Sequence, residues 1–309
     1  MGSNTPLVTI VLSTYNGDRY LQEQINSLLS QTYKNIKILI RDDGSTDSTH
    51  EILKNYASKN KNIEVIFEKN IGVVASFLRL VAMASSESEF ISFCDQDDVW
   101  SPEKIARAVS LLKQYDPDTP LLYCGLVEIV DKELQHIRYG RTPSRKLTIK
   151  NAIVENIATG CTSVINKPAI NLIVDGGVSA NNISMHDWWM YILISTFGTV
   201  VFDKKSNIKY RQHENNVIGS FTGLTFWLER IKRQLSRNNK IMQAQVVELL
   251  KRYETLMEES ARVLLKNFAT GTISGNVAAR FFYAINTPVY RQRVVDTFIL
   301  RILIVLGKI

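Results

Sequence analysis

Four continuous apolar runs separated by helical patterns fill the first hundred residues, and they constrain the fold more than any other feature of the chain. The runs are VTIVLS (8–13), IKILI (36–40), IEVIF (63–67) and FISF (90–93), with apolar residues at helical spacing between them. Strands that are apolar on both faces and alternate with helices are typical of a parallel sheet covered on both sides. The sequence therefore predicts an α/β fold with a mainly parallel central sheet.

Polar loops begin where three of these runs end. They read STYN (13–16), RDDGSTD (41–47) and DQDD (95–98). Ligands of such folds bind at the carboxyl ends of the strands, where these loops emerge. We therefore expect a binding site at this edge of the sheet.

The DQDD loop places three carboxylates, Asp95, Asp97 and Asp98, within four positions. Adjacent carboxylates repel one another and resist desolvation, so the group either fans out into solvent or shares a cation. Mg²⁺ and Mn²⁺ prefer oxygen ligands and often complete their shell with water and substrate phosphates. The position of the loop at the expected binding edge favours the cation.

The RDDGSTD loop carries more acid than a turn requires. Gly44 permits a sharp turn, and Asp47 or a neighbouring hydroxyl can cap the next helix. The additional carboxylate of Asp43 is better placed to accept hydrogen bonds from a nucleotide base or ribose. Ser13 and Tyr15 could flank the same base, although a tyrosine there could equally pack in the core.

The middle of the chain is less regular. An apolar run over 121–131 predicts one strand, 138–146 reads as a polar loop, and HDWWMYILIS (186–195) opens a helix. The G-x-G-x-x-G of a nicotinamide-binding turn and the G-K-[ST] of a P-loop are missing, which disfavours those enzyme classes.

The end of the chain is helical and basic. Apolar spacing predicts one helix over 224–235 and a single long helix over 240–266, while 294–306 is too short for a membrane span of about 20 residues. That last segment fits either an interfacial helix or one packed on the preceding domain. Residues 221–309 contain 14 Lys and Arg but 6 acids, within a net charge of +7 for the whole chain. Such an excess suits nucleic acid, an anionic membrane or phosphorylated ligands.

Cysteine content and the N-terminus favour a cytoplasmic location. Cys94, Cys124 and Cys161 are odd in number and widely spaced, which matches neither a disulfide framework nor a zinc site. No apolar h-region follows a basic start, so we expect no signal peptide.

The stretches VTIVLSTYNGDRYLQEQINSLLSQTYKNIKILIRDDGSTD and CDQDDVWSPEKI together resemble the family 2 glycosyltransferases of the GT-A fold. The resemblance is greatest to bacterial rhamnosyltransferases of surface-polysaccharide assembly. It implies a GT-A (Rossmann-like) nucleotide-sugar-binding domain over 1–220. A basic helical C-terminal extension over 221–309 would follow it and contact a membrane.

The resemblance also implies residue roles. Ser13, Tyr15 and Asp43 would contact the base and ribose of the nucleotide. Asp95 and Asp97 would form the D-x-D element, with Asp97 the ligand of a Mg²⁺ or Mn²⁺ ion and Asp95 nearer the ribose. Asp98 would be a local structural partner.

A catalytic base usually lies at the start of a helix in this family, as the second acid of a Glu-Asp or Asp-Asp pair. Here the pair is His186-Asp187, which assigns the base to Asp187 and leaves the role of His186 open. Without the resemblance, Asp187 could be only a helix cap. Trp188 and Trp189 would offer an apolar face to an acceptor sugar, unless one of them packs in the core. His213 would lie near the diphosphate or the metal.

The implied reaction is an inverting, metal-dependent sugar transfer at the cytoplasmic face of the cell membrane. The leading donor is dTDP-L-rhamnose, the acceptor is a polyprenyl-linked saccharide, and the extension contacts anionic lipid. No nucleic-acid partner is expected. The alternatives are a donor carrying glucose, galactose or N-acetylglucosamine, or a non-catalytic nucleotide-sugar-binding module.

Overall fold

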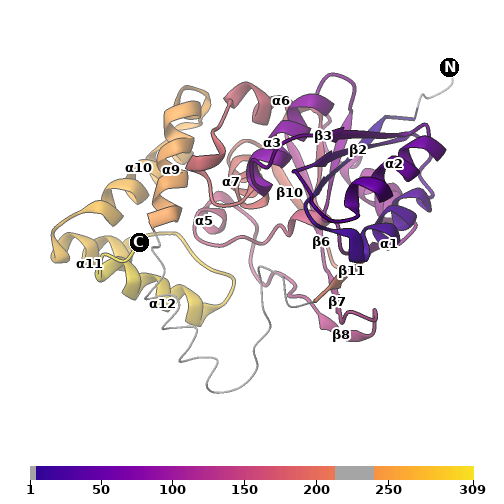
Figure 1. The fold of residues 1–309 in the computed structure, drawn as a ribbon. Helices are drawn as coiled ribbons and strands as arrows, with labels where there is room; N and C mark the ends of the chain where they lie inside the picture. Colours follow the sequence, from indigo (N-terminus) through magenta and orange to yellow (C-terminus); the bar gives the residue numbers. More distant parts are fainter. Residues whose placement is uncertain (1–4, 213–239) are drawn as a thin grey trace.

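The computed structural model describes residues 5–212 and 240–309. Its main sheet has seven strands in the order β10-β6-β9-β4-β1-β2-β3 (Figure 1). All neighbours run parallel except β9, which is antiparallel to β4 and β6. The predicted, mainly parallel sheet is confirmed. Its strands are β1 (Val8–Thr14), β2 (Ile36–Asp42), β3 (Ile63–Phe67), β4 (Phe90–Cys94), β6 (Leu121–Gly125), β9 (Val164–Asn166) and β10 (Thr199–Asp203).

Helices cover both faces of this sheet, which explains why its strands are continuously apolar. One hydrophobic cluster joins Val11 of β1 to the helices α3, α6 and α7. The other joins Ile10 and Leu12 of the same strand to α1, α2 and α4. The helices are α1 (Asp18–Leu29), α2 (Thr49–Lys59), α3 (Val73–Ala84), α4 (Lys104–Leu112), α5 (Ile149–Ala152), α6 (Lys167–Gly176) and α7 (His186–Phe197).

A second, four-stranded sheet lies beside the first. Its order is β5 (Val99–Trp100), β11 (Ile208–Arg211), β7 (Glu128–Val130) and β8 (His136–Tyr139). The single strand predicted over 121–131 is therefore wrong, because the chain leaves the main sheet after Gly125 and enters the second sheet at Glu128. Both halves are largely buried, so the apolar run gives no sign of the break.

The C-terminal region consists of α9 (Lys240–Tyr253), α10 (Glu259–Ile273), α11 (Val277–Asn286) and α12 (Val294–Val305). The single helix predicted over 240–266 is wrong, since the chain turns at a 3-10 helix, Glu254–Leu256, and α10 packs back on α9. One face of α12 joins the same hydrophobic cluster as α7. The predicted helix over 224–235 and the 220/221 domain boundary lie outside the described residues.

Gly198, at the junction of α7 and β10, makes the closest approach to neighbouring backbone. A Cβ there would lie 1.8 Å from the carbonyl oxygen of Pro120. We expect Gly198→Ala to lower the free energy of unfolding by about 3 kcal/mol, because backbone must move to relieve the overlap. A Cβ on Gly275 would meet nothing within 4 Å, so Gly275→Ala is the control. Denaturant unfolding of both variants tests this, and equal stability would contradict it.

Candidate active site

The carboxyl ends of β1, β2 and β4 meet at one edge of the main sheet, as the register shows. Leu12 pairs with Cys94, and Thr14 pairs with Asp42. Gln96, within the acidic loop, binds the first loop twice: its Oε1 accepts from the Tyr15 amide at 2.9 Å, and its Nε2 donates to the Tyr15 carbonyl at 3.1 Å. The predicted convergence of the three polar loops is confirmed.

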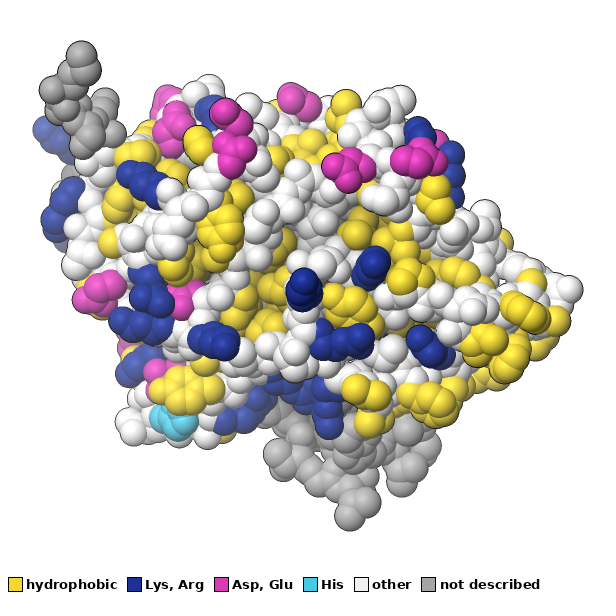
Figure 2. All heavy atoms as spheres, turned by 180° about the vertical axis from the view of Figure 1, so that it is seen from behind, with side chains coloured by type: hydrophobic (Ala, Val, Ile, Leu, Met, Phe, Trp, Pro, Cys, Tyr) yellow, Lys and Arg dark blue, Asp and Glu magenta, His cyan; other side chains and the backbone are white. Residues whose placement is uncertain are grey.

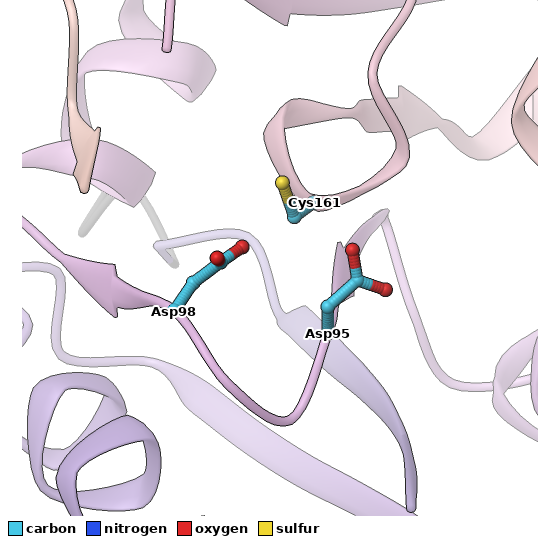
Figure 3. Close-up of side chains that lie close together, drawn as sticks. All are labelled: Asp95, Asp98 and Cys161. Carbon is cyan, nitrogen blue, oxygen red and sulfur yellow. The ribbon is translucent and has the colours of Figure 1, made fainter. Parts of the chain in front are cut away.

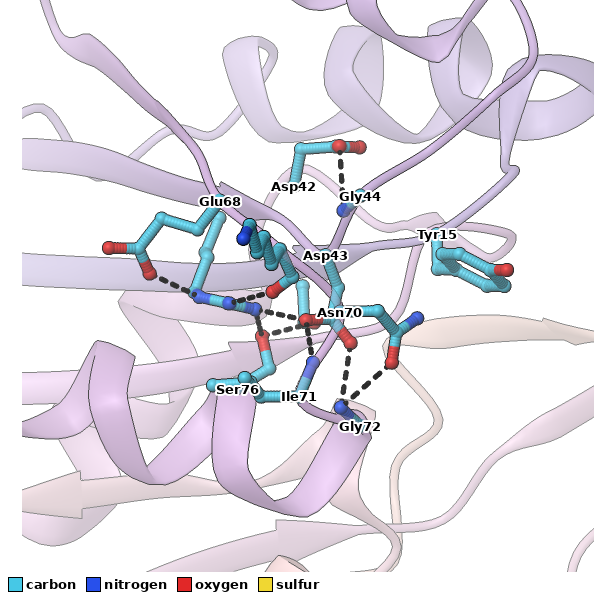
Figure 4. Close-up of polar contacts among 12 residues, drawn as sticks. Tyr15, Asp42, Asp43, Gly44, Glu68, Asn70, Ile71, Gly72 and Ser76 are labelled. Carbon is cyan, nitrogen blue, oxygen red and sulfur yellow. Dashed lines mark hydrogen bonds and ion pairs between the residues drawn. The ribbon is translucent and has the colours of Figure 1, made fainter.

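Tyr15 is not a core residue. Its side chain is 49% exposed at this edge (Figure 4). Ser13 is half-buried and shares a hydrogen bond of 2.6 Å with the hydroxyl of Ser76, at the start of α3. Of the two residues assigned to the nucleotide base, Ser13 therefore lies near the end of β1 and Tyr15 directly after it, with its ring exposed to solvent.

Asp42 is the structural acid of the RDDGSTD turn. Burial would raise the pKa of its carboxyl, but hydrogen bonds from Ser45 and Thr14 outweigh burial and hold the pKa below its usual value. Gly44 adopts a left-handed φ of 82°, and a Cβ there would lie 3.1 Å from the Asn70 amide. The turn therefore requires a glycine.

Asp43 is held by a network that sequence reasoning missed (Figure 4). Its Oδ1 accepts from the Ile71 amide at 2.8 Å and its Oδ2 from the Gly72 amide at 2.9 Å. The guanidinium of Arg41, itself buried, also binds Asp43 and the Ser76 hydroxyl. This carboxylate orders the segment after β3 and retains acceptor capacity for a ligand on Oδ2.

The segment after β3 is thus a fourth polar loop at the same edge. Arg41 reaches it through the Lys69 carbonyl at 2.8 Å and the Glu68 carboxylate at 2.9 Å. The sequence contains a signal for this loop. The polar residues EKN (68–70) follow the third apolar run directly, just as the three other polar loops follow theirs.

Asp95, Asp98 and Cys161 bring their side-chain ligand atoms within 4.8 Å of one another (Figure 3). The two acids flank the turn between β4 and β5, and the thiol comes from the 3-10 turn Gly160–Thr162. Burial, and then the carboxylates of Asp97 and Asp187, raise the pKa of Asp95 to about 7. Burial, and then the carboxylates of Asp97 and Asp95, raise the pKa of Asp98 well above its usual value.

The acidic cluster is only partly neutralised by protein groups. Asp98 accepts from the Arg211 amide through Oδ1 at 3.1 Å, while its buried Oδ2 has no N–H or O–H donor among the described residues. Arg211 also donates its Nε to the Asp97 carbonyl at 2.9 Å, which fixes the loop. Lys104 acts on Asp98 electrostatically, but its own burial lowers its pKa to about 7.

These donors fit a hard divalent cation. Carboxylate oxygens are the preferred ligands of Mg²⁺ and Mn²⁺, and an orphaned buried oxygen is what such an ion satisfies. Cys161 is a less suitable ligand, because these cations prefer oxygen to sulfur, and burial raises the pKa of its thiol. His213, the other expected metal ligand, lies outside the described residues.

Asp187 faces the same acidic cluster from the start of α7. Its Oδ2 accepts from the Gly160 amide at 3.1 Å, and its Oδ1 accepts from the Trp188 amide at 2.6 Å. Burial raises the pKa of its carboxyl to about 6. Because Gly160 adjoins Cys161, the 3-10 turn links this acid to Asp95.

His186 and Trp189 belong to the core. The His186 ring stacks on Phe77 at 4.0 Å between ring centroids, and burial lowers its pKa to about 3, so it stays neutral. Trp189 is fully buried against Tyr253, which removes it from the expected acceptor surface. Trp188 is half-buried and donates its indole N–H to the Ala152 carbonyl at 2.7 Å. Only Trp188 of the pair keeps an accessible face.

Known proteins share both the fold and the sequence pattern. The structure of Staphylococcus aureus TarS 1–349 in complex with UDP-GlcNAc superposes with a TM-score of 0.59 at 16% identity, covering 91% of this chain and 82% of that one. The mannosyltransferase PcManGT of Pyrobaculum calidifontis, in complex with GDP-Man and Mn²⁺, gives 0.51 at 15% identity, covering 99% and 86%. The fold is that of the GT-A glycosyltransferases.

The family follows from the sequence. The model of glycosyl transferase family 2 matches residues 9–172, more than half of the chain. The dTDP-rhamnosyl transferase RfbG of Shigella flexneri is 30% identical over 68% of this chain and 74% of its own length. An uncharacterized glycosyltransferase of Rickettsia typhi is 31% identical over 69% of this chain and 67% of its own length. The chain belongs to glycosyl transferase family 2.

Proposed function

We propose that this chain is an inverting, metal-dependent glycosyltransferase of cell-surface polysaccharide assembly. It would move a sugar, with L-rhamnose the leading candidate, from a nucleoside diphosphate-sugar to a hydroxyl of a polyprenyl-linked saccharide. The observation that carries the proposal is the placement of Asp187. Its carboxylate accepts a hydrogen bond from the Gly160 amide and is near enough to the acidic cluster to raise the pKa of Asp95.

In this proposal the donor lies along the carboxyl edge of the main sheet. Ser13, Tyr15 and Asp43 contact the base and ribose, and Asp95 lies nearer the ribose. Asp97, whose carboxylate acts on both Asp95 and Asp98, would hold the Mg²⁺ or Mn²⁺ ion. His213 would be a further ligand, and Trp188 would be a wall for the acceptor. The exposed ring of Tyr15 and the capacity left on Asp43 support the nucleotide end of this assignment.

In the proposed reaction the protein has to carry out a single proton transfer. Asp187 accepts the proton of the attacking hydroxyl as the oxocarbenium-like centre forms, and its raised pKa makes it a stronger base than an ordinary aspartate. The metal, when bound, neutralises the charge that develops on the departing diphosphate. No acid is needed to protonate such a leaving group, which is consistent with a single catalytic carboxylate.

The donor sugar is proposed from relatedness. RfbG is named a dTDP-rhamnosyl transferase, while the two superposed structures hold UDP-GlcNAc and GDP-Man. A donor screen tests this assignment. The protein is incubated with Mn²⁺, a saccharide acceptor and a panel of nucleotide sugars, and the released nucleoside diphosphate is measured. We expect release from dTDP-L-rhamnose above all others. Release from another donor would change the sugar, and binding without release from any donor would favour the non-catalytic module.

The rate of transfer should depend on the ionisation of Asp187. A base must be deprotonated, and burial raises the pKa of this carboxyl to about 6. We therefore expect the rate to rise tenfold per pH unit below about pH 6 and to level off above it. A profile of kcat against pH in saturating Mn²⁺ checks this. A rate already level between pH 4 and pH 6, as an unshifted aspartate would give, would contradict it.

The domain division and location are also proposed. Residues 1–220 would form the catalytic unit, and the basic extension over 221–309 would contact an anionic membrane at the cytoplasmic face. No helix within residues 5–212 or 240–309 combines the length and apolarity that a membrane crossing requires.

A further inference from the structure

The helices α11 and α12 expose large apolar side chains on one end of the molecule (Figure 2). Val294 is 78% exposed, Phe282 is 68% exposed and Phe298 is 64% exposed. We call this the α11–α12 face; it consists of Phe281, Phe282, Ile285, Val294, Phe298 and Ile302. Scattered exposed apolar residues are ordinary, but six large ones on two helices that pack against each other are the kind of group that marks an interaction site.

The exposure is not a sign of loosely attached helices. The opposite side of α12 buries Leu300, Leu303 and Ile304 in the main hydrophobic cluster, and Ala284 of α11 joins the same cluster. Arg291, just before α12, donates its Nε to the Val154 carbonyl at 3.0 Å. Both helices are therefore anchored to the catalytic unit and apolar on their outer side as well.

The exposed charge carried by α11, α12 and the segments beside them in the sequence has one sign. Residues 261–309 contain seven Lys and Arg and a single acid, Asp296, whose side chain is buried. Arg293 and Lys308 are exposed at the two ends of α12. In Figure 2, Lys and Arg side chains lie beside the apolar group, and no Asp or Glu side chain is visible within it.

We propose that the α11–α12 face inserts in the plane of an anionic bilayer, at the boundary between headgroups and acyl chains. This rests on the proposed function only in assuming that the chain works at a membrane. An apolar face flanked by basic side chains is the pattern of interfacial helices. A helix of about 18 Å, the length of α12, is too short to span the hydrocarbon core of about 30 Å, so it lies flat.

A second copy of the chain fits this face less well. In a symmetric dimer the same patch meets itself, so basic side chains would face basic side chains without an exposed acid on either helix. Anionic lipid headgroups supply the missing charge, and acyl chains cover the phenylalanines.

Vesicle flotation of the intact protein tests the proposal. We expect binding to vesicles of phosphatidylcholine with about one-third phosphatidylglycerol, and partial retention when NaCl rises from about 0.1 M to about 0.5 M, because salt screens only the charges. Phe282→Ser and Phe298→Ser should each weaken partitioning about tenfold. Ile302→Ser should also weaken it, whereas Met83→Ser on α3 should not, although both side chains are 42% exposed.

A second measurement reports insertion directly. Tryptophan placed by Phe282→Trp should be quenched by brominated lipids, and tryptophan placed by Met83→Trp should not. Absence of flotation, equal partitioning of Phe282→Ser and Met83→Ser, or an unquenched Phe282→Trp would overturn the proposal. A concentration-dependent dimer of the wild-type protein that Phe282→Ser dissociates would also overturn it. Nucleoside diphosphate release without vesicles is measured separately, so a failure of the proposed function is distinguishable.

Discussion

Replacing Asp187 by asparagine is expected to reduce sugar transfer by about 100- to 10,000-fold, the range of a lost general base. Asparagine keeps the shape of the side chain, and its carbonyl oxygen can still accept from the Gly160 amide. It cannot take a proton from the attacking hydroxyl. Single-turnover transfer with saturating donor, Mn²⁺ and acceptor isolates this step from binding.

The donor should still bind to Asp187→Asn, since the substitution changes none of the residues assigned to the nucleotide. Titration calorimetry with the nucleoside diphosphate measures this separately. Asp175→Asn, an exposed acid at the end of α6, is the matched control and should transfer at the wild-type rate. Transfer by Asp187→Asn within a few-fold of wild type would reduce Asp187 to a helix cap.

Loss of the Asp97 carboxylate is expected to abolish metal-dependent turnover. Asp97→Ala should weaken donor binding in Mn²⁺, and EDTA should have the same effect on the wild-type protein. Activity restored by adding Mn²⁺ or Mg²⁺ in excess over EDTA is the control for irreversible damage. Full activity in EDTA would leave Asp95, Asp97 and Asp98 as a structural acidic turn and would contradict the metal assignment.

Metal binding should also raise the free energy of unfolding, by an amount that depends on pH. The folded protein raises the pKa of Asp95 to about 7, so it holds this proton more tightly than the unfolded chain does. Stability therefore falls as pH rises from about 4 to about 7 when no cation is present. A cation at 100 times its dissociation constant restores about 2.7 kcal/mol.

Melting temperatures with and without Mn²⁺, at pH values below and above 7, measure this effect. The rise on adding Mn²⁺ should be larger at the higher pH, where the carboxylates are deprotonated and available as ligands. Asp97→Ala should reduce the rise at the higher pH. An equal rise in this variant and the wild type would place the ion elsewhere.

The sequence predicted the part of the site that is built from the successive strands of the first hundred residues and the loops that follow them. Strands β1, β2, β3 and β4 appear within two residues of the predicted ranges, because each is apolar on both faces and ends at a polar loop. The convergence of those loops follows from parallel pairing alone. Pairings between distant segments carry no such periodic signal, so the link from Gly160 to Asp187 was not predicted.

Other features depend on tertiary packing that local pattern does not encode. The run over 121–131 looked like one strand because β6 and β7 are both buried, although they lie in different sheets. The sequence does not say which of the two adjacent tryptophans is the core residue. The helical rotation between them turns Trp189 into the core and leaves Trp188 half-buried. Asp43 looked free for a ligand, whereas Arg41 and two amides after β3 already bind it.

The central claim is that a single carboxylate, Asp187, drives direct displacement at a metal-bound donor. The anomeric configuration of the transferred sugar tests this claim most directly. The measurement is the proton NMR spectrum of the product formed from the preferred donor, with the configuration read at the anomeric centre. We predict the configuration opposite to that of the donor. Retention of the donor configuration would mean either a second displacement or attack from the face of the leaving group, and it would contradict the account.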